Sequence, residues 1–433
     1  MDAQPTDPPA SMDIPEAARA LGGAPLTEDA LRVHVWPLFS RVREALGDRI
    51  YLANHSLGRP PDRTAEDVRR AVDLWYTELG GAWDGWSEIR SRYRAGIAEL
   101  IGCARHDAVV PKTSVAQGLR AVLNALPEPT PNVVTTRGEF DSVDHVLKAS
   151  AHKGRARVRF VDADGAGALD GREIAAAITD ETDLVVVSVV AFVTGQIVPR
   201  LGEVIERARE RGVLVLLDTY HAAGVMPLRF DDLGADFMVG GNYKYTRGGP
   251  GACWLAIHPR HLTEGGTPDP GGLFTLDTGW FAKREPFAYQ RSETVDLAPG
   301  GDGWLEATPA VLAEAQALAG LELTNALGVE RLRAHNLDQQ RRLTDLLGDA
   351  GVRTVRVARP DQPEPSHGAF VLVPVENAEA ALAALDERGV TADARPCPTT
   401  GSWSVRLCPD LLTSDDELVR ASRALAEALG RIG

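Results

Sequence analysis

Short apolar runs alternate with helix-like segments through the middle of the chain, from about residue 110 to residue 255. The β-branched runs lie at 158–164, 183–192, 213–218, 236–241 and 252–258. Between them, apolar residues recur at helical spacing, most clearly at 201–212, which ends in the helix-closing Gly212. Because the runs are apolar at consecutive positions, we expect helices to cover both faces of the strands. The pattern predicts an α/β fold with a mostly parallel mixed sheet.

A second pattern follows a stretch rich in glycine and proline at about 265–309. A helix is expected at 309–327, and after it come strands at 353–358, 369–375 and 403–408 and helices at 376–389 and 414–429. This alternation predicts a small C-terminal α+β domain. We therefore expect a flexible arm at 1–25, a large domain at 26–320 and a small domain at 321–433, with residues 26–60 packing against the small domain.

Charge and composition narrow the classes of partner. The 433 residues are 44% hydrophobic and carry 46 Lys+Arg against 61 Asp+Glu, a net charge of −15, so nucleic-acid and membrane partners are not expected. The longest apolar run, 184–193, is half of the ~20 residues that cross a bilayer. The N-terminus has no basic start or apolar block of a secretory signal, and the four cysteines form no Cys-x-x-Cys pair. These features favour a cytoplasmic protein.

Polar residues gather where two of the expected strands end. The strand at 213–218 ends in Asp218, with His221 three residues later, and the strand at 236–241 is followed by Lys244. Ends of parallel strands are where α/β ligand sites form. Alone, Asp218 would be read as a helix cap and Lys244 as a solvated side chain. Together they suit pyridoxal phosphate, since a buried lysine can form a Schiff base and a carboxylate can keep a pyridine nitrogen protonated.

Further motifs surround these residues. They are Asp218-x-x-His221, Asn-Tyr-Lys-Tyr at 242–245 with Gly-Gly-Pro-Gly at 248–251, Phe-Val-Thr-Gly-Gln at 192–196, Tyr-Leu-Ala-Asn-His-Ser-Leu-Gly at 51–58 and Gly-Trp-Phe at 279–281. In combination they resemble kynureninase, within the class V aminotransferase group of fold-type-I pyridoxal phosphate enzymes, and the resemblance runs from about residue 50 to about residue 425.

The resemblance implies roles for individual residues around the cofactor. Lys244 would hold pyridoxal phosphate covalently, Asp218 would pair with its ring nitrogen and His221 would lie beside that aspartate. The residues implied to contact the rest of the cofactor are Thr113, Ser114, Phe140, Tyr243, Trp280 and Thr308. Thr113, Ser114 and Tyr243 would bind the phosphate, the first two at a helix N-terminus, which favours anions, and Phe140 would stack on the ring.

Two further implications concern the substrate and the assembly. Arg406 would bind the α-carboxylate of an amino-acid substrate, for which a planar two-pronged donor is well suited, and His55 and Ser56 would lie in the substrate site. Trp280 would reach the phosphate of a neighbouring subunit, which predicts a homodimer with shared sites.

The sequence departs from the family pattern at three places, all among the residues that the resemblance implies contact the substrate side chain. The family's Ser-Asn before proline is Ala307-Thr308, the Asn of its Gly-Asn-Ser-Leu-Gly is His55, and the aspartate of its Phe-Pro-x-Asp is replaced by Asp141 or displaced to Asp144. Losing an amide contact in a buried pocket costs about 1–3 kcal/mol. We therefore expect a substrate related to kynurenine but not necessarily kynurenine itself.

The leading hypothesis is hydrolytic cleavage of the Cβ–Cγ bond of a γ-oxo amino acid, giving alanine and a carboxylic acid. Two alternatives on the same fold are transamination and a desulfurase- or selenocysteine lyase-type β-elimination in which Cys397 supplies a thiol. A homologue that binds the cofactor without turnover is the third. No His-Glu-x-x-His spacing and no Walker-type Gly-Lys-Ser/Thr loop is present, so a metal or nucleotide site is not expected.

Overall fold

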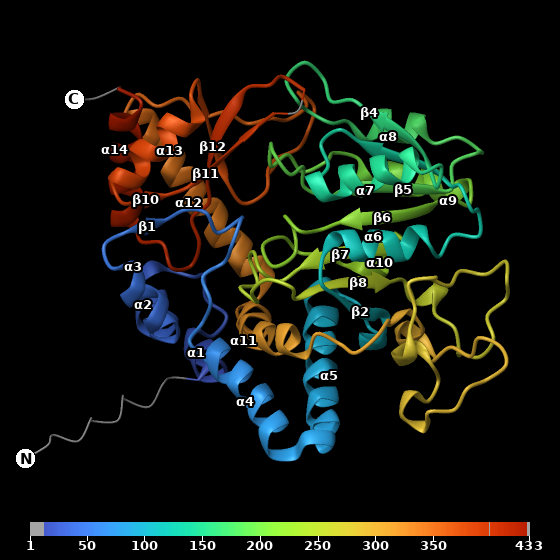
Figure 1. Ribbon diagram of the computed structural model, residues 1–433. Helices are drawn as coiled ribbons and strands as arrows, with labels where there is room; N and C mark the ends of the chain where they lie inside the picture. The colour runs from blue at the N-terminus through green and yellow to red at the C-terminus, as the bar shows by residue number, and fades with distance from the viewer. Residues whose placement is uncertain (1–12, 398, 431–433) are drawn as a thin grey trace, which may run out of the picture.

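The computed structural model describes residues 13–397 and 399–430, and its centre is a seven-stranded sheet in the order β2-β8-β7-β6-β5-β3-β4 (Figure 1). The strands are β2 (Val109–Lys112), β3 (Asn132–Thr136), β4 (Arg157–Val161), β5 (Leu184–Ser188), β6 (Leu214–Asp218), β7 (Phe237–Gly241) and β8 (Cys253–Ile257). Strand β8 runs antiparallel to both neighbours, and the other pairs are parallel. This confirms the predicted α/β fold with a mostly parallel mixed sheet.

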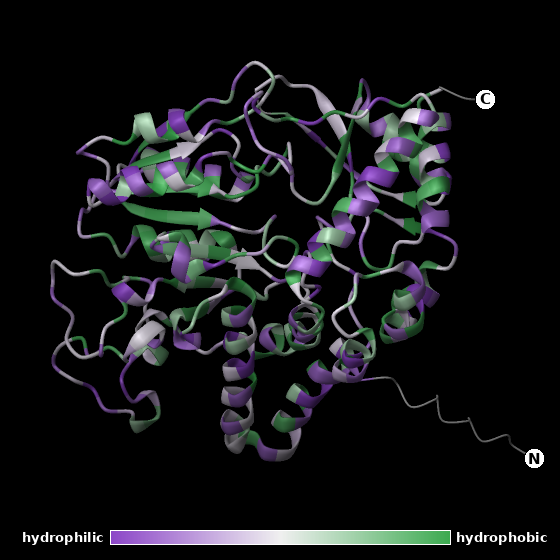
Figure 2. Cartoon of the chain, turned by 180° about the vertical axis from the view of Figure 1, so that it is seen from behind, coloured by the Kyte–Doolittle hydropathy of each residue, from purple (hydrophilic) through white to green (hydrophobic). Residues whose placement is uncertain are grey.

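Helices cover both faces of this sheet. The strand side chains alternate between two cores: Val185 and Val187 pack on one face, whereas Leu184 and Val186 pack on the other. The first core is closed by α5 (Ala82–Ile101), α8 (Gly171–Ala177) and α9 (Leu201–Glu210), and the second by α6 (Val115–Leu123) and α7 (Asp141–His152). Burial on both faces explains why the strands are apolar at consecutive positions. In Figure 2 these strands are mostly green, the colour of hydrophobic residues.

The remaining parts of the large unit lie around the β2 edge. Helices α4 (Arg63–Glu78) and α5 pack against α11 (Val311–Leu327), and the short α10 (Phe230–Leu233) follows β6. From residue 258 to 310 the chain has only 3₁₀ turns, among them η5 (Trp280–Ala282). The expected domain boundary at residue 320 falls inside α11, a continuous helix that packs mainly on α4 and α5.

The C-terminal unit is an antiparallel sheet in the order β11-β12-β9 with helices packed on it. Its elements are β9 (Val371–Val375), β11 (Asp393–Pro396), β12 (Trp403–Leu407), α12 (Val329–Asp349), α13 (Ala378–Glu387) and α14 (Asp415–Ala428). The strand expected at 353–358 is wrong: only Val355 bridges to Leu372, because Val355 and Val357 pack half-buried against a small core without a continuous ladder of hydrogen bonds. From the N-terminal side, β1 (Ile50–Tyr51) pairs with β10 (Val390–Thr391).

The N-terminal part of the described chain is helical. Helices α1 (Ile14–Leu21), α2 (Glu28–His34) and α3 (Ser40–Leu46) follow one another, and α1 packs against α11. The expected arm at 1–25 is therefore wrong for residues 14–21, because Ile14, Ala17 and Leu21 form a buried apolar stripe; residues 1–12 lie outside the described part. Among the described helices, none combines the length and the hydropathy needed to cross a bilayer.

Candidate active site

Two neighbouring strand ends form the centre of the candidate site. Strands β6 and β7 run parallel, with Asp218 at the end of β6 paired to Val239, so Asp218 and the turn after β7 meet at the same edge of the sheet. The turn carries Lys244. It is held from outside by the N–H of Gly58, which donates to the carbonyl of Tyr243 over 2.7 Å. A side chain at Gly58 would collide with the carbonyl oxygen of Lys244, so this contact requires glycine.

Lys244 is buried beside His221. The two side chains are joined by a 2.8 Å contact between Nζ of Lys244 and Nε2 of His221, and both residues are less than a tenth exposed. Burial lowers the pKa of Lys244 to about 7 and the pKa of His221 well below its ordinary value. Because burial favours the neutral form of both groups, the contact is a hydrogen bond between neutral side chains, which holds the Lys244 amine in place.

Asp218 is a buried carboxylate that suits a cationic partner. It accepts a hydrogen bond of 2.9 Å from the backbone N–H of Tyr220, and among the described residues it forms no ion pair. Burial raises its pKa, and only the positive charge of Lys244 opposes this shift among nearby side chains. A protonated pyridine nitrogen would supply the missing counter-charge, so the donor and acceptor set of Asp218 and Lys244 fits pyridoxal phosphate.

Arg406 lies in the same cluster, on β12, and its guanidinium is held by the chain itself. Its Nε and Nη2 donate to the two carboxylate oxygens of Asp393 over 2.8 and 2.5 Å, and its Nη1 donates to the carbonyl of Phe192 over 2.8 Å. These contacts use three of the five N–H groups of the guanidinium and leave two for a ligand.

His55 and Ser56 complete the network around Asp393. Nε2 of His55 lies 2.8 Å from Oδ1 of Asp393, and the Ser56 hydroxyl donates to Oδ2 over 2.9 Å. Burial lowers the pKa of His55 to about 4, so the ring is neutral and its Nε2 carries the donated hydrogen. Both predicted residues thus lie next to Arg406, but they contact Asp393 rather than Arg406 itself. Burial alone would raise the pKa of Asp393, but His55 and Arg406 hold it far below its ordinary value.

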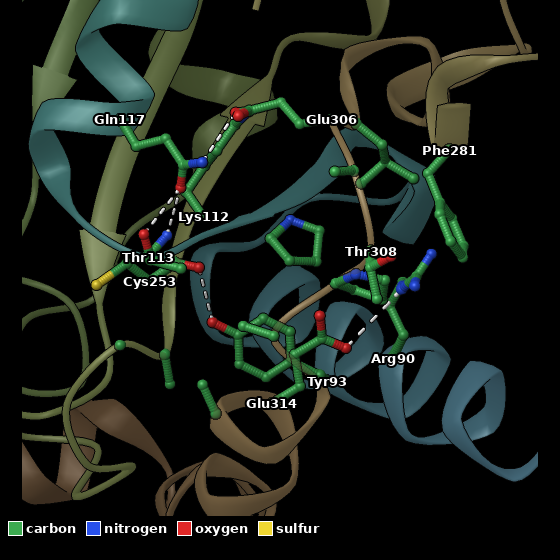
Figure 3. Close-up of a pocket in the computed structure, with 18 residues that line it drawn as sticks. Arg90, Tyr93, Lys112, Thr113, Gln117, Cys253, Phe281, Glu306, Thr308 and Glu314 are labelled. Atoms are coloured by element: carbon green, nitrogen blue, oxygen red, sulfur yellow. Dashed lines mark hydrogen bonds and ion pairs between the residues drawn. The ribbon is translucent and has the colours of Figure 1, made fainter. Parts of the chain in front are cut away.

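The start of α6 forms the expected phosphate end. Ser114 caps this helix by accepting from the N–H of Gln117 over 3.2 Å, while Thr113 donates through its N–H and its hydroxyl to Oε1 of Gln117. Beside it Lys112, buried, donates to Glu306 over 2.8 Å. Lys112, Thr113, Gln117, Glu306 and Thr308 line a cavity of about 270 Å³ shown in Figure 3, whereas Ser114 does not line it, so the structure brings Thr113 and Thr308 to one place.

The predicted aromatic residues occupy three different positions. Phe140 precedes α7, and its ring centroid lies 4.9 Å from that of Phe192, which in turn lies 5.9 Å from Nζ of Lys244. The half-buried Tyr243 has its ring 5.7 Å from Tyr220, and burial raises its pKa. Trp280 lies away from these rings, in an aromatic cluster with Trp83, Phe281 and Phe287.

A second buried carboxylate was not found from the sequence. Glu139, rather than Asp141 or Asp144, is the acidic residue of its segment that faces the core: its carboxyl accepts from Thr136 over 2.6 Å and from Ser188 over 2.5 Å. Ser188 is paired with Asp218 across β5 and β6. Asp141 is exposed at the start of α7 and Asp144 pairs with Lys148 over 2.6 Å, so both lie on the surface.

Cys397 is half-buried in the turn between β11 and β12.

Asp393, which begins β11, is the other residue that was missed from the sequence. No strand was expected at 393–396, so nothing in the sequence pointed to Asp393. Its partner could be assigned only once the register between β11 and β12 was known.

Comparisons with known proteins concern the family and the fold of the chain. The sequence profile described as aminotransferase class-V matches residues 85–426. Among curated proteins, a kynureninase of Xanthomonas campestris pv. campestris (strain B100) is 28% identical over 334 residues, covering 73% of this chain and 76% of its own. A kynureninase of Bacillus cereus is 28% identical over 393 residues, 86% of each chain.

A similar fold is found in the solved complex between the cystine C-S lyase C-DES and its reaction product cysteine persulfide. It has a TM-score of 0.76 at 21% sequence identity and covers 89% of this chain and 99% of that one. At this identity the likeness concerns the fold. Together with the family profile, it confirms the architecture expected from the resemblance found in the sequence.

Proposed function

The chain belongs to the class V aminotransferase family, and from this premise we propose that it is a kynureninase-like hydrolase. It uses pyridoxal phosphate as its cofactor. The reaction is the cleavage of the Cβ–Cγ bond of a γ-oxo amino acid, kynurenine or a relative of it, to alanine and a carboxylic acid. The observation that carries the proposal is the buried cluster of Asp218, His221 and Lys244 with Arg406 beside it. The curated kynureninases among its relatives support this choice within the family.

Pyridoxal phosphate supplies an electron sink for negative charge that develops on an amino acid. Lys244 would hold it covalently, and Asp218 would keep its ring nitrogen protonated. Once released, the Lys244 amine is neutral enough near pH 7 to take the α-proton of the substrate, because burial has lowered its pKa. His221, 2.8 Å from Nζ, would hold this amine in position through a hydrogen bond.

Arg406 would bind the α-carboxylate of the substrate through the two N–H groups that Asp393 and Phe192 leave free. Ser114 and Thr113 at the start of α6 would bind the phosphate, with Tyr243 as a further donor. Phe140 would pack on the ring. We also propose a cytoplasmic homodimer in which Trp280 completes the partner's site, while Thr308 contacts the cofactor beside Thr113 of its own chain.

The competing reaction is a β-lyase reaction that uses Cys397. One observation favours it: the Cys397 side chain lines a cavity together with Arg395, whose charge acts on Lys244. Transamination would leave the Cβ–Cγ bond intact and release a keto acid. The products therefore distinguish the three reactions.

The test is an absorbance spectrum of the purified holoenzyme followed by product analysis. We expect a near-visible cofactor band that is lost in Lys244→Ala and kept in Lys148→Ala, which removes an exposed lysine of α7. We then expect alanine in amounts equal to the carboxylic acid formed. A chain without the band, or one that forms only a keto acid or sulfide, contradicts the proposal.

A further inference from the structure

One face of the C-terminal sheet continues from Arg406 toward a separate cavity. Across the three strands, Asp393, Arg406 and Leu372 lie side by side in one row. Two residues further along the strands, Arg395, Ser404 and Pro374 form a second row. Side chains two residues apart on a strand point to the same face, about 7 Å from one another. Arg395 and Ser404 therefore lie on the same face of the sheet as Arg406, in the neighbouring row.

This second row opens into a cavity of about 350 Å³ between the sheet and the loop after Phe192. Ser404, Leu372, Pro374 and Arg395 line it from the sheet. From the large unit it is lined by Val193 and Thr194, which follow the residue whose carbonyl accepts from Arg406. The cavity therefore borders Leu372, the strand partner of Arg406, and the two residues that follow Phe192.

The polar lining of this cavity is cationic and hydroxylic. It consists of the side chains of Arg356, Arg395, Thr194, Thr400, Ser402 and Ser404. Among the described residues that line the cavity there is no aspartate or glutamate. The chain as a whole has a net charge of −15, so a cavity with a positively charged lining differs in sign from the rest of the molecule.

The two arginines are only loosely paired within the chain. Arg395 has an Nη2 contact of 3.5 Å to Asp393 and gives Nη1 to the carbonyl of Ala394, and Arg356 has a 3.5 Å contact to Glu364. Their side chains are 40% and 48% exposed, and surface pairs of this kind are weak. Both guanidiniums can therefore turn toward an anion in the cavity.

We propose that this cavity is the subsite for the far end of the substrate side chain, and that it selects a γ-oxo amino acid whose side chain ends in an anionic group such as a carboxylate. The proposal rests on the proposed function, in which Arg406 binds the α-carboxylate. A short extended carbon chain spans the distance from one sheet row to the next, so one molecule can meet Arg406 with its α-carboxylate and Arg395 with its distal anion. Arg356 and the hydroxyls would complete the distal contacts.

A substrate of this class is 2-amino-4-oxoheptanedioic acid. Water adds to its γ-carbonyl, the Cβ–Cγ bond breaks, Cβ receives a proton, and the products are alanine and succinate. The matched neutral compound is 2-amino-4-oxoheptanoic acid, which has a side chain of similar length without the distal carboxylate.

The experiment compares these two compounds in two assays. Calorimetric titration of the cofactor-loaded Lys244→Ala variant measures binding without turnover, and alanine release by the wild-type holoenzyme measures kcat/KM. We expect the diacid to bind, and to be turned over, at least about tenfold better than the neutral compound, because charge-assisted hydrogen bonds are the strong ones. Arg395→Gln should reduce this preference to about twofold or less. The control is Arg388→Gln, which removes an exposed arginine of the same unit, paired with Glu427 outside the cavity, and should leave the preference unchanged.

The two assays separate this proposal from the proposed function. If the diacid binds preferentially and Arg395→Gln abolishes the preference, the subsite stands even when no alanine is released, and only the proposed hydrolysis fails. If alanine is released from both compounds with equal kcat/KM and the two bind equally, the subsite is overturned and the hydrolysis stands. Retention of the preference in both Arg395→Gln and Arg356→Gln also overturns it, because the distal anion is then bound elsewhere.

Discussion

Glu139 offers the sharpest test of the electrostatics next to Asp218, through the substitution Glu139→Gln. The carboxyl is fully enclosed and accepts from Thr136 and Ser188, and no arginine or lysine of the described chain forms an ion pair with it. Burial raises its pKa to about 7, and the charge of Asp218 adds to the rise. Glutamine has the same shape and can keep both hydroxyl contacts, because Ser and Thr hydroxyls donate or accept.

The expected magnitude follows from the difference between the folded and unfolded pKa values. In the unfolded chain a glutamate titrates at about 4.3, whereas in the fold Glu139 holds its proton up to about pH 7. Between these values the folded state binds more protons than the unfolded state, so the wild-type protein loses stability as pH rises through this window. The full loss is roughly 3–4 kcal/mol, and Glu139→Gln does not suffer it.

We therefore expect Glu139→Gln to unfold at a higher urea concentration than the wild-type holoenzyme at pH 8 and at nearly the same concentration at pH 4.5. Glu203→Gln, which changes an exposed carboxylate on α9, is the control and should shift neither midpoint. A variant that is less stable than wild type at pH 8 would refute the reasoning. It would mean that Glu139 is ionised in the fold and that its charge is stabilised by its neighbours.

Three further predictions concern the rest of the site. Asp393→Asn should lower the free energy of unfolding by about 3–5 kcal/mol, because it leaves the buried charge of Arg406 without its counter-charge. Since the pKa of Asp393 is lowered in the fold, urea titrations should show this difference in stability above about pH 4. In more acidic solution the difference should be lost. The rate at which the cofactor-free protein captures pyridoxal phosphate should rise with pH and level off above about pH 7, where Lys244 becomes neutral; stopped-flow absorbance measures it, and a rise that continues to pH 10 would mean an ordinary solvated lysine. Cys397→Ala should keep full alanine release, and a loss of more than about tenfold would favour the β-lyase reaction.

The parts of the fold that could be predicted from sequence are those in which a residue pattern reports directly on burial. Runs of apolar residues at consecutive positions located β4, β5, β6, β7 and β8 of the central sheet, since both of its faces are covered, whereas β2 and β3 were not located. The segment at 353–358 has the same alternation as a strand, but its arginines are exposed and only Val355 pairs. Helix α1 was missed because its apolar stripe is only three residues long within an acidic, Pro-rich terminus.

The candidate site divides in the same way. Asp218 and Lys244 follow two neighbouring parallel strands, which end at the same edge of the sheet, so their proximity could be argued from topology alone. Glu139 and Asp393 could not be placed, because an isolated acidic residue near a strand end is usually exposed. Their burial depends on partners elsewhere in the sequence, Ser188 for Glu139 and Arg406 for Asp393.

The stretch from Ile50 to Gly58 is anchored at both of its ends. Near its start, the N–H of Ile50 donates to Gly389 of the C-terminal unit over 2.8 Å, and at its end the N–H of Gly58 donates to the lysine turn over 2.7 Å. The stretch thus joins the C-terminal unit to the backbone that carries Lys244 by a hydrogen bond near each end, and residues inserted between the two anchors would change how far apart they can lie.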